Sequence, residues 1–202
     1  MSTFVLATAN PDKAREIGEI LGDAVVLVPR PPGVPAIAET GETLEENARL
    51  KARALASATR LPAIADDTGL SVEALGGAPG VYSARYAGEG ASYADNVAKL
   101  LEEMSGKRGA EARRAHFSTV AIAVWPNGAE VAAEGFVNGW IAEQPRGSAG
   151  FGYDPVFVPE GGGGRSFAEM TPAEKHAMSH RGMAFVRLAE RLRALAQQPE
   201  QG

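Results

Sequence analysis

Residues 3–21 read TFVLATANPDKAREIGEIL and combine a short apolar run with a longer amphipathic one. The apolar run Thr3–Thr8 predicts a buried strand, without the basic start of a secretion signal. Asn10 followed by Pro11 is typical of a helix N-cap with proline at the first helical position. The helix that follows has one apolar face, made by Ala14, Ile17, Ile20 and Leu21. The stretch therefore predicts a strand that leads directly into a helix, the repeating unit of α/β folds.

The chain beyond this unit contains further strands and one long hairpin. Pro126, Asn127 and Gly128 form a strong turn signal between strands expected at residues 116–125 and 130–142. Shorter strands are predicted at residues 24–28, 61–65 and 156–158.

Helices alternate with these strands. Capping signals and periodicity predict helices at residues 43–59 and 92–104, from Pro172 onward, and at 180–196. Runs rich in proline or glycine predict loops at residues 29–38, 76–80 and 161–164. The order of the elements indicates an α/β protein with a mixed sheet.

The composition excludes several classes of protein. The 202 residues include no cysteine, which excludes a disulfide scaffold, a cysteine-ligated metal site and a thiol nucleophile. No apolar run approaches the ~20 residues of a membrane-spanning helix, so we expect a soluble, cytoplasmic protein. The formal net charge of −5 argues against bulk binding of nucleic acid but leaves a small anionic ligand open. Because no linker or repeat divides the chain, we predict one domain over residues 1–202.

The loop between the first strand and helix is the first candidate site, and it reads Thr8-Ala9-Asn10-Pro11-Asp12-Lys13. Backbone N–H groups and the helix dipole favour a phosphate at such a loop, and Lys13 adds a positive charge. The loop lacks the Gly-Lys-Ser/Thr of a P-loop, which argues against a kinase or a P-loop ATPase. An ordinary capped helix with a solvent-facing lysine is the alternative.

Two adjacent carboxylates form the second candidate. Asp66 and Asp67 follow the strand expected at residues 61–65, at the end of a strand where α/β folds place ligands. Mg²⁺ prefers oxygen ligands and bridges one or two carboxylates to substrate phosphates. Because neighbouring strand side chains point to opposite faces, we expect one aspartate to reach a metal and the other to be structural. An Asx turn is the alternative.

The third candidate combines Glu39 with the helix that follows it. Asn47 and Lys51 are four residues apart and share one face of that helix. Glu39 is a candidate second metal carboxylate and Lys51 a candidate phosphate contact. A capped surface helix is the alternative.

Aromatic and basic residues of the last third of the chain supply the remaining candidates. Phe151 stands between two glycines, which leaves its ring open to stack on a flat ligand, and Asp154 precedes a proline. Lys175, His180 and Arg181 donate to oxygen acceptors. A tight turn and a surface position of the basic residues are the alternatives. Together, the candidates indicate a nucleoside triphosphate bound with Mg²⁺.

Six motifs in order closely resemble the inosine/xanthosine triphosphate pyrophosphatases, house-cleaning enzymes that hydrolyse non-standard purine nucleoside triphosphates. They are TANPDK (8–13), ETGETLEENARLKA (39–52), ADDTGL (65–70), GGAPGVYSARYAG (76–88), GFGYDPVF (150–157) and SHRG (179–182). The similarity extends over residues 3–196. Ala9 stands where the family commonly has glycine, and Thr68 where serine is common.

The resemblance implies an elongated α/β structure with two lobes, a mixed β-sheet flanked by helices, an active-site cleft between the lobes, and a homodimer. It implies hydrolysis of ITP, dITP and XTP to the nucleoside monophosphate and pyrophosphate, with Mg²⁺ as cofactor. A Maf-type nucleotide pyrophosphatase with another base preference and a non-catalytic nucleotide-binding sensor are the alternatives.

The resemblance also implies roles for single residues. It makes Glu39 and Asp67 the magnesium ligands, with Asp67 also the general base. It places Thr68 beside the substrate and the phosphates on Thr8, Ala9, Asn10, Pro11, Asp12, Lys13 and Lys51. The base and nucleotide pocket consists of Phe151, Gly152, Tyr153, Asp154, Lys175, His180 and Arg181. Donors at His180 and Arg181 would favour a 6-oxo purine over adenine, whose 6-amino group is itself a donor.

Overall fold

The strands form one mixed sheet in the computed structural model, which describes residues 2–35 and 37–197. Within this part of the chain the sheet has seven strands in the order β2-β1-β3-β5-β6-β7, with β4 paired to β3 off this path. The strands are β1 (Thr3–Leu6), β2 (Val26–Val28), β3 (Ala63–Val72), β4 (Pro79–Gly80), β5 (Arg114–Val124), β6 (Glu130–Ile141) and β7 (Phe157–Pro159). Strand β1 pairs in parallel with β2 and β3, whereas β3–β4 and β6–β7 are antiparallel. The predicted mixed α/β fold is confirmed.

The helices begin and end close to where capping residues predict. They are α1 (Pro11–Leu21), α2 (Leu44–Thr59), α3 (Tyr93–Glu103), α4 (Gly109–Ala112), α5 (Pro172–Met178) and α6 (His180–Ala196). Asn10 caps α1, and capping boxes begin α2 at Thr43 and α3 at Ser92. None of the helices in the described ranges is long and apolar enough to cross a membrane.

The chain divides into two compact units. Unit 1 comprises residues 1–67, 119–135 and 181–202, and unit 2 comprises residues 68–118 and 136–180. Three of the boundaries fall inside β3, β5 and β6, so these strands contribute residues to both units, and the fourth follows His180, the first residue of α6.

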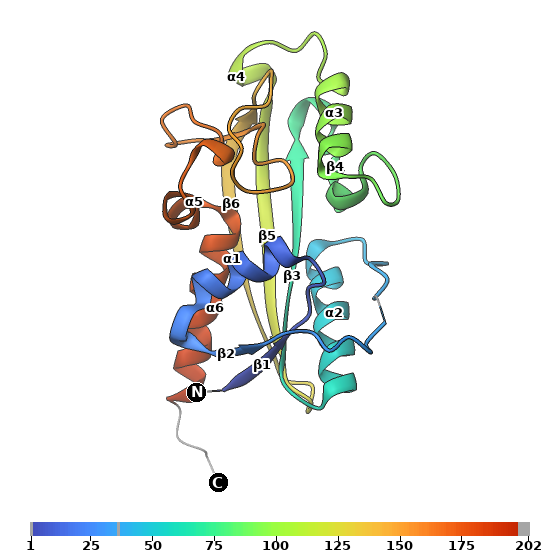
Figure 1. Cartoon of the computed structure of the whole chain (residues 1–202), viewed down its shortest axis with the longest axis vertical. Helices are drawn as coiled ribbons and strands as arrows, with labels where there is room; N and C mark the ends of the chain where they lie inside the picture. The colour runs from blue at the N-terminus through green and yellow to red at the C-terminus, as the bar shows by residue number, and fades with distance from the viewer. Residues whose placement is uncertain (1, 36, 198–202) are drawn as a thin grey trace. The chain divides into compact units, whose positions relative to one another are not determined.

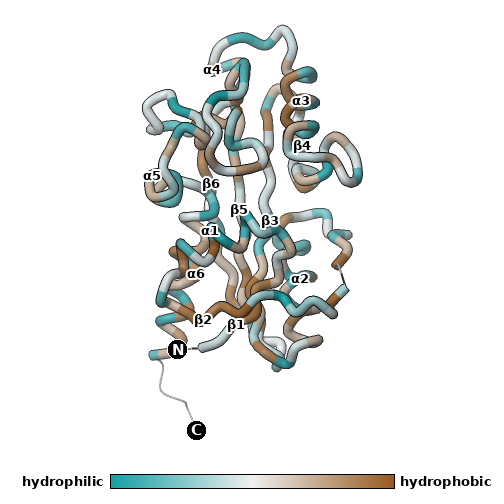
Figure 2. Tube along the Cα trace, in the orientation of Figure 1, coloured by the Kyte–Doolittle hydropathy of each residue, from teal (hydrophilic) through white to brown (hydrophobic). Residues whose placement is uncertain are grey.

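Unit 1 has a sheet covered on both faces, as Figure 1 shows for α1 and α6 on one side and α2 on the other. One core cluster joins α1 and α6 to Phe4, Leu6 and Ile64. The other joins α2 to Val5 and Ala63, which alternate with the first set along their strands. The tube is most strongly hydrophobic along β1 and β2 (Figure 2).

Unit 2 has its own core, built around the buried rings of Phe117, Phe157 and Phe167. Beside this core lies Arg113, a buried arginine with 2% of its surface exposed. Its guanidinium donates to the carbonyl oxygens of Ile141 (2.6 Å), Ala142 (2.9 Å), Met104 and Lys107 (both 3.1 Å). One side chain thus joins the end of β6 to the segment after α3.

Several strand predictions differ from the structure. The strand predicted at 61–65 does not end at the aspartates, because β3 continues to Val72 and contains both of them. Buried Leu70 and Val72 extend it, and cationic partners allow Asp66 and Asp67 to lie inside it. The alternative of an Asx turn at the strand end is therefore wrong. The strand predicted from Ala24 begins at Val26, and the predicted loop at 76–80 contains the short strand β4.

The four hydrogen bonds donated by Arg113 lead to a prediction about stability. We expect Arg113→Ala to lower the free energy of unfolding by at least about 3 kcal/mol, because it removes a buried guanidinium that donates to four backbone carbonyls. Its neighbour Arg114 is the matched control, since its side chain is half-exposed and pairs with Glu111. Arg114→Ala should change stability by no more than about 0.5 kcal/mol. Urea denaturation measures the free energy of unfolding of both variants. Equal losses would contradict a stabilising role for the Arg113 hydrogen bonds.

Candidate active site

The loop after β1 is shaped by hydrogen bonds from its own side chains. The Thr8 hydroxyl accepts from the Asn10 amide (3.1 Å), and Asn10 Oδ1 accepts from the amides of Asp12 (2.9 Å) and Lys13 (3.4 Å). This cap places Lys13 in the first turn of α1, as predicted. Residues Thr8 to Pro11 line an open pocket of about 470 Å³. The loop therefore combines a helix N-terminus with an accessible cavity.

Asp66 is enclosed by cations on the face of β3 that packs on α1 and α6. Its Oδ2 lies 3.3 Å from Lys13 Nζ and 3.6 Å from Arg181 Nε, and 1% of its side chain is exposed. Arg181 also pairs with the buried Glu16 at 2.7 Å. Burial opposes the charge of Asp66, but Lys13, Arg181 and Lys51 outweigh it and hold the pKa of Asp66 far below the usual range. Asp66 is therefore a carboxylate locked in its ionised form.

Asp67 has a different set of partners on the α2 side of β3. Lys51 Nζ donates to Asp67 Oδ1 at 2.9 Å and to Glu39 Oε1 at 2.8 Å. Burial raises the pKa of Asp67, the nearby Glu39 adds to this effect, and the lysines offset it only in part. Burial also works against the charge of Lys51, but the carboxylates around it raise its pKa. The prediction that the two aspartates face opposite ways is confirmed by their separate partners.

The segment that carries Glu39 is held to α2 by Asn47. The buried Asn47 accepts from the Gly41 amide at 2.8 Å through Oδ1, and its Nδ2 has no hydrogen-bond partner among the described residues. A Cβ at Gly41 would lie 2.6 Å from Glu46 Cβ and 2.9 Å from Asn47 Oδ1. Glycine is therefore required for the close approach of this segment to the start of α2.

The donor set around Asp67 fits a hard divalent cation. Asp67 Oδ2 is buried and has no hydrogen-bond partner among the residues that the structure describes, and Glu39 and Asp67 both contact Lys51. The ion-paired carboxylates Glu16, Glu39, Asp66 and Asp67 outnumber the cations Lys13, Lys51 and Arg181 by one. The described residues include no group of three metal-ligating side chains. Mg²⁺ needs only one or two protein carboxylates, because it takes its other ligands from water and phosphates.

In unit 2, a buried ion pair organises the GFGYD segment. Lys175 Nζ lies 2.6 Å from Asp154 Oδ2, which also accepts from the Phe151 amide at 2.8 Å. A Cβ at Gly150 would lie 2.0 Å from that same oxygen, and the backbone φ of +73° also favours glycine. Lys175 Nζ lies 5.1 Å from the centre of the Phe151 ring, and the Tyr93 ring centre lies 5.7 Å from it. The segment thus presents a partly exposed aromatic ring beside a buried cation.

Two other predicted site residues belong to the interior of unit 2. Tyr153 is buried and donates its hydroxyl to the Ser83 carbonyl at 2.9 Å. His180 is 2% exposed and stacks on Phe117 with ring centres 4.3 Å apart. Arg181, which belongs to unit 1, is 3% exposed. The alternative of a surface position for His180 and Arg181 is therefore wrong.

The predicted residues are divided between the units. Unit 1 holds Thr8, Ala9, Asn10, Pro11, Asp12, Lys13, Glu39, Lys51, Asp67 and Arg181, and unit 2 holds Thr68, Phe151, Gly152, Tyr153, Asp154, Lys175 and His180. Sequence reasoning missed Glu16, the partner of Arg181. Its place three residues after Lys13, beside the core residue Ile17, is the signal that could have identified it.

The packing at Gly41 predicts a difference between two glycines. Gly41→Ala should lower the free energy of unfolding by about 1–3 kcal/mol, because the new methyl group overlaps Glu46 and Asn47. Gly33→Ala is the control, since a Cβ there meets no atom within 4 Å. Its effect should stay within about 0.5 kcal/mol. Thermal or urea unfolding compares the two, and a neutral Gly41→Ala would contradict the close contact.

Known proteins are similar to this chain over almost its whole length. The model of the Ham1 family matches residues 4–191. A dITP/XTP pyrophosphatase of Rhodopseudomonas palustris is 45% identical and covers 93% of this chain and 94% of its own. A dITP/XTP pyrophosphatase of Yersinia pseudotuberculosis is 48% identical and covers 96% of this chain and 99% of its own.

Solved structures agree with the sequence comparison. A HAM1 protein from Coxiella burnetii superposes with a TM-score of 0.85 at 42% identity, covering 96% of this chain and all of the other. The nucleoside-triphosphatase, or dITP/XTP pyrophosphatase, of Mycobacterium abscessus has a TM-score of 0.70 at 42% identity, covering 96% and 97% of the two chains. The family resemblance inferred from the six motifs is confirmed, and the chain belongs to the Ham1 family.

Proposed function

We propose that this chain hydrolyses non-standard purine nucleoside triphosphates, namely dITP, ITP and XTP, to the nucleoside monophosphate and pyrophosphate. The observation that carries this proposal is Lys51 held between the carboxylates of Glu39 and Asp67. This arrangement places a cation that can bind phosphate beside two carboxylates that can bind a metal ion. The relatives named dITP/XTP pyrophosphatase support the same reaction.

The triphosphate is assigned to unit 1. The loop from Thr8 to Lys13 offers backbone N–H groups at the start of α1, and Lys13 and Lys51 supply positive charge. Both lysines contact carboxylates, so their positions are set before a ligand arrives. Phosphoryl transfer depends mainly on such positioning and charge neutralisation.

Glu39 and Asp67 would hold Mg²⁺, the cofactor we propose. When bound, the ion neutralises phosphate charge and assists activation of water. Asp67 is also the proposed general base. The pKa of this buried carboxylate lies above that of an ordinary aspartate, which makes it a better proton acceptor than an exposed one.

The reaction balances with water as the only co-substrate. A water oxygen bonds to the α-phosphorus while the bond from that phosphorus to the oxygen bridging to the β-phosphate breaks. Asp67 accepts the proton of the attacking water. The bridging oxygen leaves with the pyrophosphate, and the nucleoside monophosphate remains.

The base is assigned to unit 2 together with Arg181. Thr68 is placed beside the substrate, and the ring of Phe151, held through Asp154 and Lys175, offers a stacking surface. Donors at His180 and Arg181 would pair with a 6-oxo group and leave the 6-amino group of adenine facing other donors. We further propose that residues 1–202 act as one bilobed domain, as a homodimer in the cytoplasm.

Asp67→Asn tests the assignment of the base. We expect kcat for pyrophosphate release from dITP to fall at least about 100-fold, the loss typical for removal of a general base. Nucleotide affinity should change little, because Lys13 and Lys51 remain. The exposed Asp23 is the control, and Asp23→Asn should retain wild-type kcat. A near-normal kcat for Asp67→Asn would contradict the role.

A substrate panel tests the reaction itself. Pyrophosphate release is measured from dITP, XTP, GTP and ATP, with Mg²⁺ and with a chelator. We expect rapid, metal-dependent release from dITP and XTP and little from ATP. Orthophosphate as the first product would place cleavage at the γ-phosphate. Tight binding without turnover would favour a nucleotide sensor instead.

A further inference from the structure

Arg30, in the loop after β2, donates hydrogen bonds to the backbone of two loops. Its Nη1 donates to the carbonyl of Ala7 (3.4 Å), and its Nη2 donates to the carbonyls of Val34 (3.0 Å) and Pro35 (2.5 Å). Ala7 directly precedes the loop that begins at Thr8. Three neutral acceptors thus hold one guanidinium in a fixed orientation.

The charge of Arg30 is not compensated within the part of the chain that the structure describes. Unlike Lys13, Lys51, Lys175 and Arg181, it forms no ion pair with a described carboxylate. Carbonyl dipoles stabilise a guanidinium but leave its full positive charge. An anion therefore gains more from Arg30 than from a cation that already has a carboxylate partner.

Arg30 lines the 470 Å³ pocket beside the loop Thr8–Pro11. It is the only charged side chain among the described lining residues, which include no carboxylate. Thr8 and Asn10 supply the other polar side chains, while Pro29, Pro31 and Pro32 form a stiff apolar wall. A phosphate group entering this pocket would meet one positive charge and no negative one.

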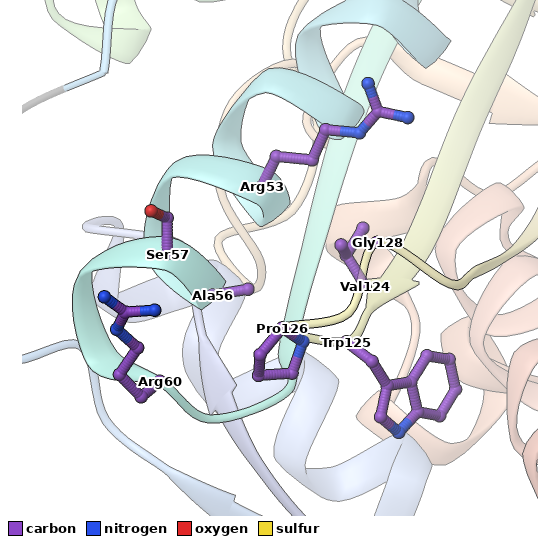
Figure 3. Close-up of a pocket in the computed structure, with 8 residues that line it drawn as sticks. All are labelled: Arg53, Ala56, Ser57, Arg60, Val124, Trp125, Pro126 and Gly128. Carbon is purple, nitrogen blue, oxygen red and sulfur yellow. The ribbon is translucent and has the colours of Figure 1, made fainter.

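A second pocket of unit 1 provides the contrast. It has a volume of about 240 Å³ and lies between α2 and the turn of the β5–β6 hairpin (Figure 3). Its two arginines differ from Arg30, because Arg53 pairs with Glu130 at 3.0 Å and Arg60 is exposed. Arg60 is not fastened by any hydrogen bond of its side chain in the described residues. It would lose side-chain entropy on binding an anion, whereas Arg30 is already ordered.

We propose that the Arg30 pocket is an anion subsite that takes the pyrophosphate portion of the triphosphate, with Arg30 as a direct binding residue. This inference rests on the proposed function. Three of the five guanidinium N–H groups donate to carbonyls, which leaves the N–H of Nε and one N–H of Nη1 to donate to phosphate oxygens. The same subsite holds the released pyrophosphate until it leaves.

Calorimetric titration with inorganic pyrophosphate in metal-free buffer tests the subsite without requiring turnover. Arg30→Gln should weaken pyrophosphate binding by about tenfold, the change expected when one charge-assisted hydrogen bond is lost. Arg30→Lys keeps the charge and should retain most of the affinity. Binding of IMP, which lacks the pyrophosphate portion, should be unchanged in both. Arg60→Gln is the matched control and should bind pyrophosphate like the wild type.

The outcomes separate the two proposals. Unchanged pyrophosphate affinity in Arg30→Gln would overturn the subsite, whatever the enzyme does with nucleotides. Equal losses in Arg30→Gln and Arg30→Lys, with IMP binding lost as well, would mean that Arg30 only fastens the loops, and would also overturn it. Absence of pyrophosphate release from every purine triphosphate would contradict the proposed function, while the titration would still report on the pocket.

Discussion

Two adjacent aspartates inside a buried central strand are the constraint on which unit 1 depends. Asp66 and Asp67 are 3% and 5% exposed, and desolvating two carboxylates is costly unless each has a charged partner. Strand geometry turns them to opposite faces, so the two aspartates form their ion pairs with different cations. Helices α1 and α6 therefore bring Lys13 and Arg181 to one face, and α2 brings Lys51 to the other.

The two faces differ in chemistry because their charges differ. Asp66 lies between two cations, and its pKa is held far below the usual range, which suits a structural role. Asp67 shares one lysine with Glu39, and its pKa is raised by burial. Because two carboxylates share one lysine, their negative charge is only partly neutralised. Such a pair is suited to binding a metal ion or a proton. The two aspartates thus combine an ionised support with the carboxylate that we propose as the general base.

In unit 2, too, a buried ion pair positions a segment of the backbone. The buried pair of Lys175 and Asp154 orients the backbone of Phe151, as the pair of Lys51 and Glu39 fastens the segment before α2. In each place a glycine allows the backbone to approach, at Gly150 and at Gly41. Two arginines depart from this pattern, Arg113 in unit 2 and Arg30 in unit 1. Among the described residues each guanidinium donates only to carbonyls, which orients the charge without cancelling it.

Features that depend on neighbouring residues were predictable from the amino-acid sequence. The cap at Asn10 and the boxes at Thr43 and Ser92 begin helices where predicted, and Pro126–Gly128 turns the hairpin. Six ordered motifs were enough for the family, because each contains several fixed residues. The partners of the buried charges became known only from the folded chain. The strand was predicted to end before Asp66. It continues because Asp66 forms ion pairs with Lys13 and Arg181, and local propensity cannot reveal contacts with residues so distant in sequence. Glu16 and Arg30 were missed for the same reason, since a charged residue reveals its role only through what folding brings beside it.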